Sequence, residues 1–291
     1  MSLSKTTIGP FELYTIETGD FRLDGGAMFG VVPKTLWERG IPADDKNRIP
    51  MTMRCLLIRS TNTGKVYLID NGAGTKFDDK MTNIYQLDQT KKNLENSFNE
   101  HGFSFDDVTD IIFTHLHFDH CGGTSFYNEE HELQHTFPNA TYHVVDSHWK
   151  TATDPNARER ASFLPENINP IKDSGRLNLV NDSHEYEPGL NAITVNGHTK
   201  GQQLPKITHG DTTIVFVADL LPTHVHVPLP WVMGYDMYPA QTLNEKKEFL
   251  QKAASEQWNL YLEHDAEREM IRIEEDNDRF KVSDHFTLNE L

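Results

Sequence analysis

Four potential metal ligands lie close together in this chain. Residues 114–123 read THLHFDHCGG, which places His115, His117, Asp119 and His120 directly after an apolar segment. Along an extended segment, side chains two residues apart share a face, so the first two histidines point the same way and the later pair can turn to a neighbouring point. Imidazole and carboxylate groups suit zinc or iron, and one such cluster can serve two ions. A solvated polar loop is the alternative, and the density of ligands disfavours it.

Three further candidate ligands each follow a segment with strand character, and they are His198, Asp219 and His264. Taken alone, a strand-end aspartate is usually a turn residue, and a single histidine is usually a hydrogen-bonded surface group. Sheet topology can bring strand ends together although they are distant in sequence. We therefore expect these three residues to join the histidine cluster.

Strands and helices must position these ligands. The expected strands are 53–59, 66–70, 110–113, 141–145, 192–195, 213–218 and 260–262, with a turn at 61–65 between the first two. Apolar spacing predicts helices over 87–101, ending at Gly102, and over 243–258. Hairpin-like pairs alternate with helices rather than forming a strict βαβ series. This mixture favours sheets with helices outside them.

Composition limits the classes of partner. The chain has 291 residues, of which 37% are apolar, and this suffices for a folded core. Its net charge of −17 would repel phosphate backbones, so nucleic acid is not an expected partner. Residues 1–10 lack the pattern of a secretion signal, no apolar run reaches the length of a membrane span, and the two cysteines are far apart. We therefore expect a cytoplasmic protein that does not enter a membrane.

The seven candidate ligands together resemble the signature of the metallo-β-lactamase superfamily, which is His-x-His-x-Asp-His followed by a distant His, an Asp and a final His. The resemblance covers residues 53–264 and keeps the order of the ligands. It implies an α+β fold, the four-layer αβ/βα sandwich, in which two mixed β-sheets pack face to face and the metal site lies at one edge. Residues 1–291 would form a single metallo-hydrolase domain.

The resemblance also implies two divalent metal ions, with zinc expected and manganese or iron as alternatives. His115, His117 and His198 would bind the first ion, Asp119, His120 and His264 the second, and Asp219 would bridge the two. Asp219 stands where the antibiotic-degrading members carry a cysteine, which argues against a β-lactamase. His117 stands where the oxygen-reducing iron members carry a glutamate, which disfavours redox chemistry.

A branch of the family is indicated by residues 24–37 and 219–236. They resemble the quorum-quenching lactonases and their organophosphate-hydrolase neighbours. The implied reaction is attack by a metal-bridging hydroxide on the ester of an N-acyl-homoserine lactone, with Asp119 passing a proton to the leaving group. The expected partner is thus a small molecule with an apolar part.

Aromatic and methionine side chains gather in two irregular stretches, 22–50 and 222–240, which we expect to wall the substrate cleft. The candidate substrate contacts are Met28, Phe29, Trp37, Trp231, Met233 and Tyr235. Ordinary core packing or a homodimer interface is the alternative for these side chains.

The sequence departs from the family pattern at two positions. The best-known lactonases place a tyrosine three residues after the bridging aspartate, where it contacts the substrate carbonyl, but here that residue is Pro222. Tyr235 or His226 is the candidate replacement, and with Asp119 they form the set of catalytic candidates. Gln202 stands where many members carry a second histidine. Phosphotriester hydrolysis, thioester hydrolysis of the glyoxalase II kind and metal binding without turnover therefore stay open as alternatives.

Three other signals receive simpler interpretations. Residues 131–135 read HELQH, which matches the zinc-protease pattern, but the segment is short, polar and placed just before a strand rather than in a helix. His224 is interpreted as a surface residue. Cys121 is expected to pack rather than to react.

Overall fold

The computed structural model describes residues 4–277 and 279–291. A first sheet is built from the N-terminal part of the chain, and its strands lie side by side in chain order. They are β1 (Lys5–Ile8), β2 (Phe11–Asp24), β3 (Arg48–Ser60), β4 (Val66–Ile69), β5 (Asp110–Ile112), β8 (Thr141–Val145) and β9 (Leu177–Val180). Strands β1 to β4 pair antiparallel, and β4, β5, β8 and β9 pair parallel.

A second sheet is built from the C-terminal part, again in chain order. Its strands are β10 (Glu185–Glu187), β11 (Leu190–Val195), β12 (Gln202–His209), β13 (Thr212–Phe216), β14 (Asn259–Tyr261), β15 (Met270–Asp276) and β16 (Arg279–Phe286). Only the β13–β14 pair among these described strands is parallel. Strands β6 (Ser125–Tyr127) and β7 (Leu133–His135) form a separate hairpin.

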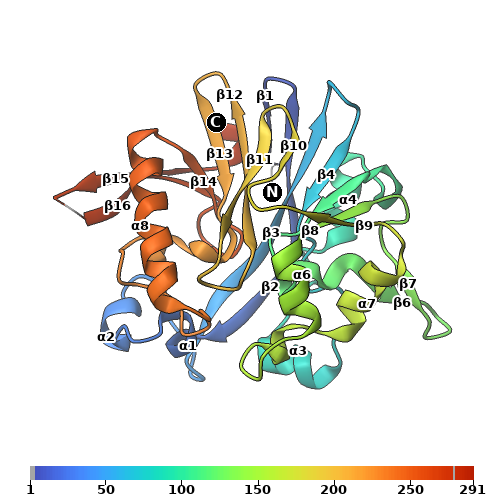
Figure 1. Cartoon of the computed structure of the whole chain (residues 1–291). Coiled ribbons are helices and arrows are strands. Elements are labelled where there is room, and N and C mark those ends of the chain that lie inside the picture. Colours follow the sequence, from blue (N-terminus) through green and yellow to red (C-terminus); the bar gives the residue numbers. More distant parts are fainter. Residues whose placement is uncertain (1–3, 278) are drawn as a thin grey trace.

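Helices cover the outer faces of the two sheets (Figure 1). Helices α4 (Leu94–His101), α6 (Asp146–Thr153) and α7 (Pro165–Asp173) pack on the first sheet, and α8 (Pro239–Ser255) packs on the second. The short helices are α1 (Gly25–Phe29), α2 (Lys34–Trp37), α3 (Asp79–Tyr85) and α5 (Phe118–Cys121). The predicted αβ/βα sandwich of two mixed sheets is confirmed.

The core lies between the layers. Alternating residues of β3, such as Leu56 and Ile58, face the second sheet and meet Ile214 and Phe216 of β13. The intervening residues, such as Leu57, face the helices of the first layer. This alternation follows from the two-residue period of a strand, and both faces of β3 are buried because β3 lies inside the sandwich.

Most predicted strands are present, with shifted ends. Strand β8 has the predicted bounds, whereas β3 begins five residues earlier than predicted, at Arg48. The helix predicted over 87–101 is wrong in its first half, because α4 begins only at Leu94. Asp88 pairs instead with Asp20 through two backbone hydrogen bonds, of 2.8 and 2.9 Å, and the side chain of Asn93 caps the helix. The helix predicted over 243–258 is α8, Pro239–Ser255.

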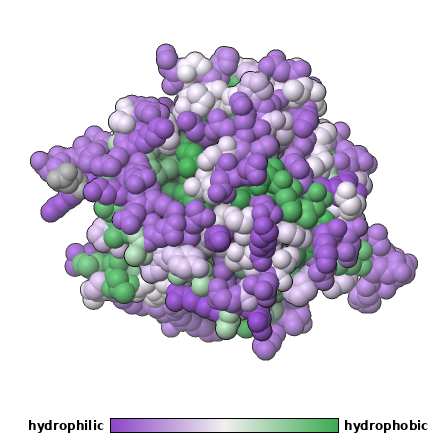
Figure 2. Space-filling view, viewed as in Figure 1, coloured by the Kyte–Doolittle hydropathy of each residue, from purple (hydrophilic) through white to green (hydrophobic). Residues whose placement is uncertain are grey.

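Hydrophilic side chains dominate the face of the molecule drawn in Figure 2, and a hydrophobic patch lies at its lower left, beside α2. The exposed apolar residues Val31 and Leu36 belong to this part of the chain. No helix within the described residues is long and apolar enough to cross a membrane.

Candidate metal centre

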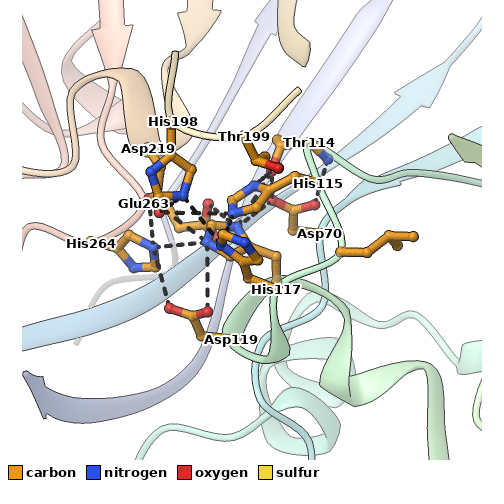
Figure 3. A network of polar contacts seen from close by, with 12 residues as sticks. Asp70, Thr114, His115, His117, Asp119, His198, Thr199, Asp219, Glu263 and His264 are labelled. Carbon is orange, nitrogen blue, oxygen red and sulfur yellow. Dashed lines mark hydrogen bonds and ion pairs between the residues drawn. The ribbon is translucent and has the colours of Figure 1, made fainter. Parts of the chain in front are cut away.

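The seven predicted ligands converge at one edge of the sandwich, where strands of both sheets end (Figure 3). His115 and His117 lie in the loop after β5, and Asp119 and His120 lie in α5. His198 follows β11, Asp219 lies in a 3-10 turn after β13, and His264 follows β14. All seven side chains are buried.

Two loops that meet backbone to backbone fix the first four ligands. The loop after β4 contacts the end of α5 so closely that a Cβ added to Gly122 would lie 2.0 Å from the carbonyl oxygen of Ala73. The backbone N–H of Asn71 also donates to the carbonyl of His120 at 2.8 Å. Glycine is required here because no side chain fits between the two loops.

One group of ligand atoms comprises four residues. His117 Nδ1 lies 3.0 Å from His115 Nε2 and 3.2 Å from His198 Nε2. Asp219 Oδ2 completes the group, 3.1 Å from His198 Nε2 and 3.8 Å from His115 Nε2. A tetrahedral zinc ion with bonds of about 2.0–2.1 Å separates its ligand atoms by about 3.3 Å, which these spacings match.

The second group shares Asp219 with the first. Asp219 Oδ1 lies 3.1 Å from His264 Nε2 and 3.7 Å from His120 Nε2. The two imidazole nitrogens are 3.1 Å apart, and the oxygens of Asp119 lie 3.8 and 3.9 Å from them. The two oxygens of Asp219 thus face different groups, as a bridging ligand requires.

Acidic side chains hold the outer nitrogens of two histidines. His117 Nε2 donates to Glu159 at 3.3 Å, and His198 Nδ1 donates to Asp236 at 3.0 Å. Thr199 also donates to Glu159, so this carboxylate joins the loops that carry His117 and His198. The hydrogen bonds fix each ring so that its other nitrogen points into the site.

The rings of the second group are fixed in the same way. His120 Nδ1 lies 2.9 Å from Asp70, and His264 Nδ1 donates to the backbone carbonyl of Thr52 at 3.0 Å. The buried Glu263 lies 3.1 Å from His120 Nδ1. Burial, together with the charge of Asp70, raises the pKa of Glu263 to about 8 against the opposing effect of His120.

His115 is held through a hydroxyl group. Its Nδ1 lies 3.1 Å from Thr114 Oγ1, and this hydroxyl donates to Asp70 at 2.6 Å. The hydroxyl can therefore accept a hydrogen bond from the histidine. The chain from His115 through Thr114 to Asp70 leaves His115 Nε2 free to bind an ion.

The donor set fits two divalent cations. Five inward-facing imidazole nitrogens share the site with two carboxylates, and Asp219 Oδ1 is buried but accepts no hydrogen bond from a described residue. Burial alone would raise the pKa of Asp219, but the neighbouring His198 and His264 outweigh it and hold this pKa well below its usual range. The site therefore requires positive charge, and a cation supplies it without a clash between imidazole protons.

A cavity of about 210 Å³ opens onto ligands of both groups. Of the predicted substrate contacts, Met28, Met233 and Tyr235 line it, so the segments 22–50 and 222–240 both contribute. Leu23, Gly234 and Met237, which lie within the two predicted segments, also line the cavity. The lining residues outside these segments were not predicted, and they are Met51, Tyr85, Phe118, Arg158, Glu159, Ala161 and Ser162. Glu159, Asp70 and Asp236 were missed because nothing in their local sequence separates them from the other acidic residues.

Three of the predicted substrate contacts, and His226, belong to the core instead. The ring of Phe29 is stacked between Trp37 and His226, with centroid distances of 5.1 and 4.4 Å, and Trp231 meets its edge. None of these four residues lines the cavity. The expectation is corrected because Phe29 and Trp37 are buried in the core, and the partly buried Trp231 packs against that core rather than lining the cavity.

The catalytic prediction for His226 is corrected on its hydrogen bonds. Its Nδ1 lies 2.8 Å from Thr223 Oγ1, and its Nε2 lies 2.9 Å from the carbonyl oxygen of Met28. Both ring nitrogens are therefore occupied by the protein. Burial also lowers the pKa of His226 to about 3. This histidine ties the turn after Asp219 to α1.

His224, the HELQH segment and Cys121 do not belong to the two groups of metal ligands and have structural roles. His224 is not a free surface residue, because its Nδ1 lies 2.5 Å from Asp265 Oδ2. The HELQH segment forms the turn and second strand of the β6–β7 hairpin, which excludes a helical protease motif. Cys121 is buried, and its thiol donates to the carbonyl of Leu116, in agreement with packing.

Gln202 supports the turn that carries Asp219, the predicted bridging ligand. With its amide oriented to satisfy its neighbours, the side-chain oxygen accepts from the backbone N–H groups of Asp219 at 3.1 Å and Leu220 at 3.2 Å. The residue that stands in place of the family's second histidine thus fixes the turn that carries Asp219.

Comparisons with known proteins agree with this geometry. The family model described as the metallo-beta-lactamase superfamily matches residues 54–264. The structure of a probable metal-dependent hydrolase from Staphylococcus aureus is 25% identical, with a TM-score of 0.87, and the match covers 97% of this chain and 98% of that one. No protein among the curated ones matches the sequence.

Two further solved structures share the fold. One is AidC, a dizinc quorum-quenching lactonase in complex with its product, which is 22% identical with a TM-score of 0.79 and 96% coverage of each chain. The other is the hydrolase AbOPH of the beta-lactamase superfamily, which is 19% identical with a TM-score of 0.78 and 96% coverage of each chain.

Proposed function

This chain belongs to the metallo-β-lactamase superfamily and is a metal-dependent hydrolase, and we propose that it opens the ester ring of N-acyl-homoserine lactones. One observation carries the proposal: a single small cavity joins ligands of both metal groups to an apolar wall. The apolar part of this wall consists of Leu23, Met28, Met51, Phe118, Met233 and Met237.

The charge of the cavity favours a neutral substrate. Among the residues that the structure describes, Arg158 is the only basic residue apart from histidine that lines the cavity, and its guanidinium donates to the backbone carbonyls of Gly234 and Asp236. The net charge of the chain is −17, which would repel a polyanion. A neutral lactone with an aliphatic tail suits such a surface, and the dizinc lactonase of the same fold supports this choice.

The residues of the chain would divide the work as follows. Two divalent ions bound here would supply Lewis acidity and a nucleophilic water at neutral pH. Asp219 holds the two ligand groups together, and Glu159 and Asp236 keep His117 and His198 in position. Asp119 lines the cavity and takes a proton from the attacking water. It returns this proton to the ring oxygen when the acyl carbon–oxygen bond breaks, which yields the open hydroxy acid.

A substrate panel tests the proposal. Homoserine lactones, neutral phosphotriesters and thioesters are compared by kcat/KM, with metal-loaded protein and a metal-stripped control. We expect lactones to be hydrolysed most efficiently and the stripped protein to be inactive. A phosphotriester or thioester turned over faster than any lactone would overturn the lactonase assignment, and hydrolysis no faster than the stripped control would overturn the enzyme assignment.

A further inference from the structure

Tyr85 is a cavity residue that the metal site does not use. Its side chain lines the same cavity as Asp119, and its ring packs on Phe118, the residue next to Asp119, at a centroid distance of 4.8 Å. Among the residues that the structure describes, none forms a hydrogen bond with its hydroxyl group. A partly buried phenol without a protein partner, at the edge of a catalytic cavity, is available to a ligand.

The ring of Tyr85 is held in a fixed position. The ring of Phe77 stacks on that of Tyr85 with a centroid distance of 5.8 Å and an interplanar angle of 26°. Together with Phe118 it forms a three-ring cluster on the cavity wall. The hydroxyl group is therefore placed without the entropy loss that a mobile side chain would suffer on binding.

Helix α3, which ends at Tyr85, is anchored at both ends. The side chain of Asp78 accepts from the backbone N–H of Met81 at the start of the helix. At its end, Arg48 donates to the carbonyls of Asn83 and Ile84, at 3.3 and 3.2 Å. Arg48 is in turn held by Asp44 at 2.8 Å. A cation that binds the last carbonyls of a helix stabilises that end.

The hydroxyl group is suited to donate rather than to ionise. A phenol has an ordinary pKa near 10 and therefore keeps its proton throughout the neutral range, and burial raises the pKa of Tyr85 further.

We propose that Tyr85 donates a hydrogen bond to the leaving-group oxygen of the substrate, beside Asp119. This inference rests on the proposed ester hydrolysis. When the acyl carbon–oxygen bond breaks, negative charge develops on the departing oxygen. The Tyr85 hydroxyl stabilises this charge and keeps its own proton, while Asp119 delivers the proton that the attacking water has lost.

Tyr235 is the other phenol in the cavity, and it is less suited to this role. Its side chain is 40% exposed and lies in the loop whose carbonyls at Gly234 and Asp236 accept from Arg158. Tyr85 comes from an anchored helix on the Asp119 side of the cavity.

The test compares leaving groups. Tyr85→Phe keeps the ring cluster and removes only the hydroxyl group. Esters of one acyl group are assayed, with leaving groups from p-nitrophenol, which departs without help, to ethanol, together with the homoserine lactone. We expect kcat/KM of the variant to fall about 10- to 100-fold for the lactone and the ethyl ester and less than about threefold for the p-nitrophenyl ester.

Two control variants and a metal analysis show whether the effect is specific to the Tyr85 hydroxyl group. Tyr127→Phe, in the exposed β6–β7 hairpin, is the matched control and should leave the whole series unchanged. Tyr235→Phe should give a series parallel to that of the unmodified protein. The metal content of Tyr85→Phe, measured by elemental analysis, should equal that of the unmodified protein.

An equal loss for every ester, a loss of bound metal, or no loss at all in Tyr85→Phe would overturn the role of Tyr85 and leave the lactonase proposal standing. If the unmodified protein hydrolyses no ester in the series, both the proposed function and this inference fail.

Discussion

At the scale of single residues, the two aspartates of the site have different proposed roles, because Asp219 would hold both ions and Asp119 would also move a proton. Asp219 faces both ligand groups with its two oxygens, whereas Asp119 belongs to only one of them. Both aspartates line the cavity. The two aspartates should therefore respond differently to substitution.

Asp119→Asn should reduce turnover of the lactone about a hundredfold or more, because an amide cannot carry the proton from water to the leaving oxygen. The fold and the first ligand group should stay intact, since Asp119 contributes to neither. Steady-state kinetics, with metal analysis of the same samples, checks this. Unchanged kcat in a fully loaded variant would remove Asp119 from the mechanism.

Side chains of the cavity wall should set the preference for acyl chains. Each buried methylene contributes about 0.8 kcal/mol, or about fourfold in kcat/KM, until the small cavity is full. Met233→Ala should flatten the dependence on chain length because Met233 lines the cavity, and Trp231→Ala should not because Trp231 packs against the core. The measurement is kcat/KM for lactones of increasing acyl-chain length, in both variants and in the unmodified protein. A flattened series in Trp231→Ala alone would contradict this assignment of the wall.

At the scale of elements, one buried histidine holds together two of the loops that carry metal ligands. His148 of α6 accepts from the backbone N–H of Leu116 at 2.8 Å. Its other ring nitrogen donates to the carbonyl of Lys200 at 2.8 Å. Leu116 lies between His115 and His117, and Lys200 lies two residues after His198, so this side chain joins both segments of the first ligand group.

His148→Leu should weaken binding of the first ion more than that of the second, because it leaves the buried N–H of Leu116 and the carbonyl of Lys200 without their shared partner. His148→Gln offers an acceptor and a donor and should retain most of the affinity. Competition with a chelator measures the two dissociation constants in each variant. Equal weakening of both ions in His148→Leu, or no rescue by glutamine, would contradict a positioning role.

The sequence predicted the ligands well because they are short-range features. Four of the seven lie in one segment after β5 and three follow other strands, and the spacing of His115, His117, Asp119 and His120 needs no knowledge of the rest of the chain. The strand pattern likewise located β8 and the buried part of β3.

The direction in which side chains point, and the contacts between distant segments, could not be predicted from the sequence in this way. The composition of residues 24–37 and 228–239 showed aromatic side chains, but only tertiary packing decides that Phe29 and Trp37 face the core while Met233 faces the cavity. The start of α4 depends on the pairing of Asp88 with Asp20, which is a contact between distant segments. The place of Tyr85 at the cavity likewise depends on distant contacts, among them the hydrogen bonds from Arg48 to the end of its helix.

At the scale of the whole molecule, a buried arginine joins the two sheets beside the metal centre. Arg54 of β3 donates to the carbonyls of Leu262, Asp265 and Arg268, which surround His264, at 2.8, 3.1 and 3.3 Å. Its guanidinium also pairs with Glu17 of β2 at 3.2 Å. The junction thus connects the N-terminal half of the fold to the last ligand.

Glu17→Gln should lower the free energy of unfolding by about 1–2 kcal/mol near pH 7. Burial raises the pKa of Glu17, but Arg54 and Lys92 outweigh it, so the folded-state pKa lies below the ordinary value of 4.5. The stabilisation by the carboxylate is therefore full above pH 4.5 and is lost as the pH falls through the folded-state pKa. Denaturant unfolding of both metal-free proteins should show a difference that closes on acidification. A difference independent of pH would contradict the ion pair.

The claim that two ions act together in lactone opening is tested most directly by a metal titration. Metal-stripped protein is titrated with zinc or manganese while lactone opening is followed by acid release, for the unmodified protein and for His117→Ala and His264→Ala, which each belong to a different ligand group. Activity should rise until two ions are bound per chain, and each variant should retain about one ion and little activity. Full activity with a single ion, or activity that survives removal of the metal, would contradict a dinuclear hydrolase.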